Sequence, residues 1–402
     1  MGMVELRARR QWALFCLAAS ATAAPAAFRL QGETALWALS VFWIVLVGLA
    51  ARRRPRLPRA VRRMALAFLV GCLPFLWTGR WADLRVGLTQ AAYFAVWGGF
   101  ELGARPRRRG RYSALMAVVV LTFAQAVGAT IRHGLGLWGG ERVGMNLVGT
   151  LGATAGIGGI GLFPSWVGVA IFLGAVTLVA FSGSRTSSGI FGIGLSIYWL
   201  TSSKQVKRKL FRGVAWALLV AGVAAVLLGR RGLERVPGAR VKRAVTFSEW
   251  YREAQWKYWV RLAMDHPLGA GFVTVTRQAE LPSHNALLFL SAAGGLGAAA
   301  IFVTGWLEAM ISLFRRSKWD ELGGLALALL MAASARMLTE NFPLGTYWGF
   351  NGVLPLLLIG FVLTRAELET THAKEILRRR KVRWRGEGEE SKSRELSEPW
   401  RA

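Results

Sequence analysis

The chain has 402 residues, of which 53% are hydrophobic, and its 51 Lys and Arg against 22 Asp and Glu give a formal net charge of +29. In soluble globular proteins roughly 45 to 50% of the residues are hydrophobic. The higher fraction in this chain argues against a soluble fold. The charge alone would suggest nucleic-acid binding. The positions of the basic residues decide between the two classes.

Apolar runs that are long enough for membrane spans follow one another along the chain. A helix needs about 20 mostly apolar residues to cross a hydrocarbon core about 30 Å thick. The sequence therefore predicts an all-α polytopic membrane protein with about twelve transmembrane helices. The predicted spans are 11–28, 35–51, 64–77, 86–102, 112–131, 145–163, 165–181, 187–200, 211–228, 284–314, 322–338 and 347–363.

These spans divide the chain into four parts. Residues 1–228 hold spans one to nine, 229–283 form a long outward loop, 284–364 hold spans ten to twelve, and 365–402 form a charged cytoplasmic tail. Small residues allow transmembrane helices to approach closely, so five glycines of the sixth and eighth spans are predicted to pack in the bundle interior. They are Gly152, Gly156, Gly189, Gly192 and Gly194.

The basic residues separate by side of the membrane when the connections are numbered alternately. The N-terminus, the even-numbered connections and the tail hold 34 of the 51 Lys and Arg. By the positive-inside rule these parts face the cytoplasm, so both termini are cytoplasmic and the odd-numbered connections face outward. Most of the net charge thus reflects membrane topology, and no nucleic-acid partner is predicted.

One outward connection departs from this pattern. The loop 229–283 is the only long extramembrane segment between the spans, and it holds ten of the seventeen outward basic residues. Long loops cross the membrane regardless of their charge, so the loop does not contradict the topology. Its basic surface indicates an anionic partner on the outer side.

Part of this loop is predicted to form a helix. Thr246 and Glu249 have the spacing of a capping box, and Pro267 stops the helix. The segment between them combines basic residues with three Trp and two Tyr. Such a composition suits the outer membrane interface, where aromatic rings lie at the depth of the lipid headgroups.

Few polar residues of the outer side are suited to chemistry. Cys16 and Cys72 lie within apolar spans, which predicts buried thiols and no disulfide. The outward loops contain no Asp-x-Asp, His-x-x-x-His or other paired-carboxylate spacing, so neither a metal site nor a cofactor is predicted. Three candidate residues remain, namely Arg185 at the junction of spans seven and eight, Arg261 on the loop helix, and His284 at the start of span ten.

The order of the motifs around these residues resembles the superfamily of O-antigen ligases and O-antigen polymerases. The resemblance covers about 181–297, and three motifs in the right order on one predicted face carry it. They are Ser-Gly-Ser-Arg ending at Arg185, Trp259 and Arg261 before the turn Pro-Leu-Gly-Ala-Gly at 267–271, and His284-Asn285 followed by Gly295.

One position within this region does not separate the two kinds of enzyme. Ligase-like sequences often carry a small or polar residue three positions after the glycine that matches Gly295. Here that position is Ala298, which is small but not polar. The choice between ligase and polymerase therefore stays open.

The resemblance implies a GT-C-like, metal-independent and cofactor-free glycosyltransferase of the bacterial inner membrane. Its donor would be a glycan linked to undecaprenyl pyrophosphate among the membrane lipids, and its acceptor a hydroxyl of lipid A core or of another glycan on the periplasmic side. Arg185 and Arg261 would bind the pyrophosphate, since guanidinium donates bidentately to phosphate oxygens. His284 would be the general base, because imidazole is the usual group for this task.

Other interpretations of the same residues stay open. Arg185 could be an interfacial anchor, Arg261 part of a solvated helix face, and His284 a residue at a helix start. Twelve spans are also a common layout of secondary transporters, whose polar sites lie at the membrane midplane. Against a transporter, Glu101 and Glu308 lie towards the cytoplasmic ends of their spans. A non-enzymatic scaffold or lipid-binding protein is the third class.

Overall fold

The computed structural model describes the residues 57–99, 108–133, 142–163, 165–182, 184–202, 207–208, 211, 249–279, 283–317, 321–339 and 353–365, together with Phe42 and Val45. All regular structure within these ranges is helical, with no strand, so the predicted all-α class is confirmed. The helices are α3 (Arg59–Val70), α4 (Phe75–Thr78), α5 (Trp81–Gly98), α6 (Arg108–His133), α7 (Arg142–Ile160), α8 (Trp166–Ser182), α9 (Arg185–Thr201), α12 (Glu249–Asp265), α13 (Phe272–Gln278), α14 (Ala286–Gly294), α15 (Leu296–Ser317) and α16 (Glu321–Met337).

Two segments of the described chain are long and apolar enough to cross a membrane, by length and composition alone. They are Arg59–Thr78, which joins α3 and α4, and Leu296–Ser317, which is α15. Three shorter apolar helical segments are Leu115–Ile131, Trp166–Ser182 and Val353–Arg365. The predicted first, second and ninth spans lie almost entirely outside the described residues.

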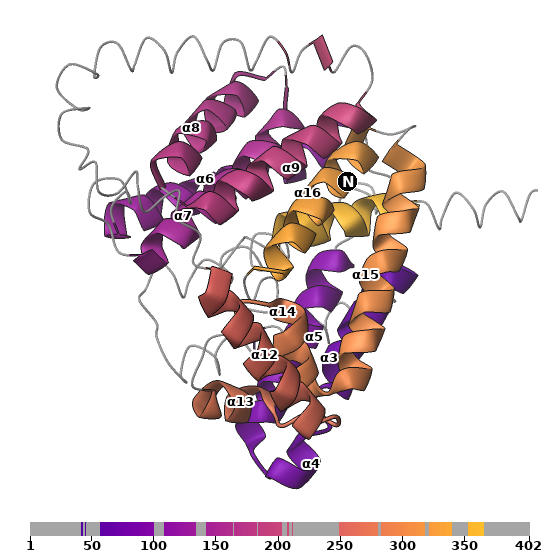
Figure 1. Cartoon of the computed structure of the whole chain (residues 1–402). Helices are drawn as coiled ribbons and strands as arrows, with labels where there is room; N and C mark the ends of the chain where they lie inside the picture. The colour runs from indigo at the N-terminus through magenta and orange to yellow at the C-terminus, as the bar shows by residue number, and fades with distance from the viewer. Residues whose placement is uncertain are drawn as a thin grey trace, which may run out of the picture.

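The helices form two packed groups (Figure 1). In the first, α15 packs on α3, α3 packs on α5, and α13 and α14 pack against this core with α12 on α14. In the second, α6, α7, α8 and α9 pack on one another. Helix α16 joins the groups because it packs against both α9 and α15.

Helices α3 and α15, which pack on each other in the first group, run antiparallel. Gly305 of α15 faces Ala60 near the start of α3, whereas Gly294, just before α15, faces Gly71 just after the end of α3. Successive membrane crossings require such alternation. The packing is therefore compatible with the orientation that the charge pattern predicts for these two segments.

An ion pair links the same two helices at their other ends. Arg63 Nη1 lies 2.8 Å from Glu308 Oε2, and Arg59 Nε lies 3.6 Å from Glu308 Oε1. The charge pattern assigns this end of α15 to the cytoplasm. Glu308 thus pairs with two arginines of the first half of α3, and its place towards the cytoplasm stays a prediction.

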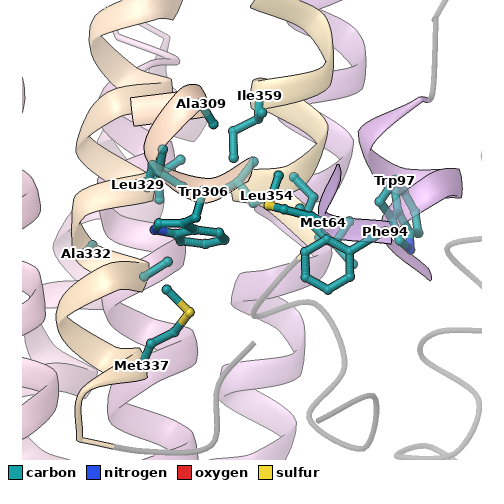
Figure 2. Packing of buried hydrophobic residues seen from close by; sticks show 14 of the residues in the cluster. Met64, Phe94, Trp97, Trp306, Ala309, Leu329, Ala332, Met337, Leu354 and Ile359 are labelled. Atoms are coloured by element: carbon teal, nitrogen blue, oxygen red, sulfur yellow. The ribbon is translucent and has the colours of Figure 1, made fainter. Parts of the chain in front are cut away.

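Aromatic rings fill the core of the first group. The ring centroid of Phe68 lies 5.2 Å from that of Phe94, 5.8 Å from Phe302 and 6.5 Å from Phe272. Trp306 stacks on Phe302 at 5.6 Å, and Figure 2 shows Phe94 and Trp306 within this buried cluster. Each buried aromatic side chain contributes about 1.5–3 kcal/mol to stability, and the cluster fixes α13 and α15 against α3.

The structure confirms close packing at three of the five glycines chosen from the sequence. A Cβ at Gly152 or Gly156 would come within 3.2 Å of side chains of α8, and Gly194 faces an isoleucine of α7. The prediction is not confirmed for Gly189 and Gly192, around which a Cβ would meet no atom of the described residues within 4 Å. Both are exposed on α9, so among the described residues nothing crowds them.

The predicted span 284–314 is not one helix. Gly295 has a φ of 92°, which ends α14 and starts α15 in a new direction. An L side chain rarely adopts this conformation. The prediction of a single continuous helix was wrong because hydropathy alone does not register a glycine that breaks an apolar run.

Substitution of this glycine should destabilise the fold. A Cβ in Gly295→Ala would lie 2.7 Å from the carbonyl carbon of Leu268, in a backbone conformation that costs about 1–2 kcal/mol for L residues. We expect a lower midpoint of thermal unfolding in detergent. Gly297→Ala is the matched control, since a Cβ there meets no atom within 4 Å. Equal midpoints for the two variants would contradict this role of Gly295.

Candidate functional site

Two motifs of the predicted site, far apart in sequence, are joined by backbone hydrogen bonds. The turn after α12 lies against the junction of α14 and α15. Trp77 Nε1 adds a bond to Gly269 O at 3.2 Å. The backbone bonds are Ala270 N to Ala292 O, Gly271 N to Ala293 O and Leu296 N to Pro267 O, each 2.9 Å.

The two glycines of this turn have no room for a side chain. Gly269 and Gly271 have φ values of 94° and 93°. A Cβ at Gly269 would lie 2.7 Å from Ala293 O, and a Cβ at Gly271 would overlap the carboxylate of Asp83. The two glycines of the Pro-Leu-Gly-Ala-Gly sequence thus allow the turn to pack closely against both the α14–α15 junction and α5.

Asp83 of α5 is a structural anchor of the glycine turn that the sequence prediction missed. Its carboxylate is buried, with 1% exposure, and accepts hydrogen bonds from Val273 N at 2.6 Å and Thr274 Oγ1 at 3.2 Å. It therefore caps the first turn of α13, where a negative charge is favoured. The available signal was that Asp83 is the only acidic residue in the predicted outward connection after span three.

Loss of this anchor should destabilise the protein. Asp83→Ala leaves the half-buried Val273 N–H without its acceptor, which costs up to about 1–3 kcal/mol, whereas Asp83→Asn retains one acceptor and should cost less. Thermal unfolding of the solubilised protein measures both. Asp265→Ala is the control because Asp265 is exposed. An Asp83→Ala midpoint no lower than that of the control would refute the anchoring role.

His284 lies directly before α14 in a strained backbone conformation. Its φ is 41°, the one positive value among the described non-glycine residues, and its side chain is half-buried. The adjacent Asn285 is the helix cap, with its Oδ1 accepting bonds from Leu287 N at 3.0 Å and Leu288 N at 3.1 Å. Capping is therefore done by the asparagine, and strain of this kind recurs at functional sites.

Arg261 lies on α12 but not on the face that packs on α14. The structure confirms the predicted loop helix and its end before Pro267, while Thr246 of the predicted capping box lies outside the described residues. Trp259 is buried against Phe289, with ring centroids 5.9 Å apart. Two residues further on, about 200° around the helix, Arg261 is exposed.

The exposed face of α12 also carries an ion pair. Lys257 Nζ lies 2.6 Å from Glu253 Oε1. The hydrogen bond from Lys257, together with its charge, lowers the pKa of Glu253 below its ordinary value. This face therefore presents charged groups to the surroundings of the helix, as expected for the outer side of an interfacial segment.

Arg185 is the first residue of α9 and is exposed. The predicted junction is confirmed, since α8 ends at Ser182 and α9 begins at Arg185. Ser184 is the cap of α9, and its Oγ accepts a hydrogen bond from Ser187 N at 3.3 Å. Behind the junction, Ser184 Oγ donates to Asn146 Oδ1 of α7 at 2.9 Å. A polar network thus fixes the start of the helix that carries Arg185.

The position of Arg185 is electrostatically suited to an anion. A helix N-terminus carries a partial positive charge and favours the binding of anions. The first turn of α9 contains no acidic residue. The charge of Arg185 and the partial charge of the helix terminus would therefore both attract a phosphate group.

The structure brings some of the predicted site together. The glycine turn, Asp83, Trp259 and His284 belong to one packed unit built on α5, α12, α13 and α14. Arg185 belongs to the other group, where α9 packs mainly on α16 and α7. That Arg185, Arg261 and His284 line a single outward cavity stays a prediction.

Comparison with known proteins names no relative. No family model matches the chain, and no curated protein matches it. The residues that the structure describes include no group of three or more His, Cys, Asp or Glu that could hold a metal ion. Cys72 is buried and not disulfide-bonded, as predicted, whereas Cys16 lies outside the described residues.

Proposed function

We propose that this protein is an O-antigen ligase-like glycosyltransferase of the bacterial inner membrane. It moves a glycan from undecaprenyl pyrophosphate to a hydroxyl of lipid A core on the periplasmic side. The observation that carries the proposal is the packing of the glycine turn 267–271 against the end of α14, the helix that lies between His284 and Gly295. The turn and this helix are two motifs that are separate in the sequence. The strained backbone of His284 supports the choice of this residue as the general base.

The membrane arrangement of the proposal has about twelve spans, with both termini in the cytoplasm. The distribution of Lys and Arg supports this orientation. The two apolar segments Arg59–Thr78 and Leu296–Ser317 and their antiparallel packing support it further. The site then lies at the outward rim and not at the midplane, which favours an enzyme over a transporter.

The proposed reaction is a direct displacement. His284 takes the proton of the acceptor hydroxyl while its oxygen attacks the anomeric carbon of the donor sugar. The bond from that carbon to the pyrophosphate oxygen breaks, and undecaprenyl pyrophosphate leaves with the electron pair. The new glycosidic bond has the inverted configuration, and the proton stays on the imidazole until it passes to solvent.

Fixed cations stabilise the leaving group in this scheme. Negative charge grows on the pyrophosphate oxygens during the displacement, and arginine remains protonated at all relevant pH values. Arg185 would bind the pyrophosphate at the start of α9, and Arg261 would bind it from the exposed face of α12. A divalent metal is then not required.

Transfer by the purified protein tests the proposal and separates ligase from polymerase. The protein is supplied with a labelled glycan on undecaprenyl pyrophosphate and with lipid A core as acceptor. Label on lipid A core is the expected result. A ladder formed from a second lipid-linked glycan alone would show a polymerase instead, and absence of both products would refute the proposed function.

A further inference from the structure

One buried side chain of α12 has polar atoms that no described residue satisfies. Gln255 has 0% exposure, and neither its Oε1 nor its Nε2 has a hydrogen-bond partner. A buried amide without partners is costly, and nearly all buried side-chain amides in proteins are hydrogen-bonded. Simple packing therefore does not explain a glutamine at this position.

The position of Gln255 follows from the packing of α12 on α14. Gln255 and Trp259 are buried one turn apart on the same face of α12, and Trp259 contacts Phe289. Further along both segments, Pro267 O accepts the hydrogen bond of Leu296 N. The two segments therefore advance in the same direction.

This common direction fixes the level of the carboxamide. One turn before Trp259 on α12 is Gln255, and one turn before Phe289 on α14 is Asn285. Gln255 thus lies level with the start of α14, where His284 has its strained backbone.

Resting on the proposed function, we infer that Gln255 binds the acceptor sugar beside His284. A carboxamide offers one acceptor and two donors, which match neighbouring sugar hydroxyls that both donate and accept. In the proposed reaction the group beside His284 is the acceptor hydroxyl, because His284 removes its proton. Gln255, level with His284, is therefore a positioning residue for the acceptor and orients that hydroxyl.

The substitution Gln255→Met tests this inference with purified full-length protein, lipid A core and glycan on undecaprenyl pyrophosphate. Methionine has a similar size and no amide, so we expect the KM for lipid A core to rise about tenfold, as for the loss of one hydrogen bond. The KM for the donor should change less than about twofold. The melting temperature without substrate should stay equal or rise, because the unsatisfied amide is gone.

Gln90→Met is the matched control, since Gln90 is also buried and its Oε1 also lacks a partner, but it lies on α5. An unchanged acceptor KM in an active Gln255→Met enzyme would overturn the inference and leave the proposed function intact. An equal rise of the acceptor KM and the donor KM in Gln255→Met, together with a lower melting temperature, would also overturn it. The same rise of the acceptor KM in Gln90→Met would do so as well. A wild-type protein without any transfer would refute the proposed function and the inference together.

Discussion

Replacement of His284 by Asn is expected to lower the kcat of glycan transfer by about 10²- to 10⁴-fold, the usual contribution of a general base. Asparagine suits this position better than alanine, because it tolerates a positive φ such as the 41° of His284. The variant therefore removes the base and keeps the backbone. The measurement is the initial rate of label transfer with both substrates saturating.

Two further variants separate the base from its surroundings. His266→Ala makes a comparable change at an exposed histidine, and its rate should stay near that of the wild type. His284→Gly should be as inactive as His284→Asn, although glycine relieves the strain altogether. If His284→Asn kept the full rate with an unchanged KM for the acceptor, His284 would not be the base.

Replacement of Arg185 by Ala is expected to reduce kcat/KM for the lipid-linked donor by about 10²-fold or more, because a fixed cation is lost where charge develops on the leaving group. Arg185→Lys retains the charge but not the bidentate geometry, so it should recover only part of the loss. Donor titrations at saturating acceptor measure both effects.

The control for Arg185 lies on the other predicted side of the membrane. Arg208 is exposed in the predicted cytoplasmic connection, and Arg208→Ala should not alter the donor dependence. Because Ser184 rather than Arg185 caps α9, Arg185→Ala should also unfold at the wild-type temperature. A donor dependence equal to that of Arg208→Ala would assign Arg185 the simpler role of an interfacial anchor.

The sequence was sufficient for those parts of the fold that local pattern determines. Apolar runs predicted an all-α fold, Pro267 predicted the end of α12, and the span boundaries at 187 and 284 predicted helix starts close to the caps Ser184 and Asn285. These features depend on residues close together in the chain. The break at Gly295 was missed, since glycine is common in transmembrane helices and its φ depends on contacts with Leu268.

The parts of the site that depend on distant contacts could not be predicted. Asp83 lies about 190 residues before the turn that it anchors, and no local spacing links them. The burial of Gln255 and the exposure of Arg261 depend on which face of α12 packs on α14. A single helix of mixed aromatic and basic residues does not specify that face.

The most direct test of the central claim is the rate of glycan transfer by the purified protein with a chelator present. The proposed mechanism relies on arginines and a histidine, so we predict that label passes from undecaprenyl pyrophosphate to lipid A core at the same rate with and without excess EDTA. Loss of transfer on chelation, with recovery on addition of a divalent cation, would contradict it.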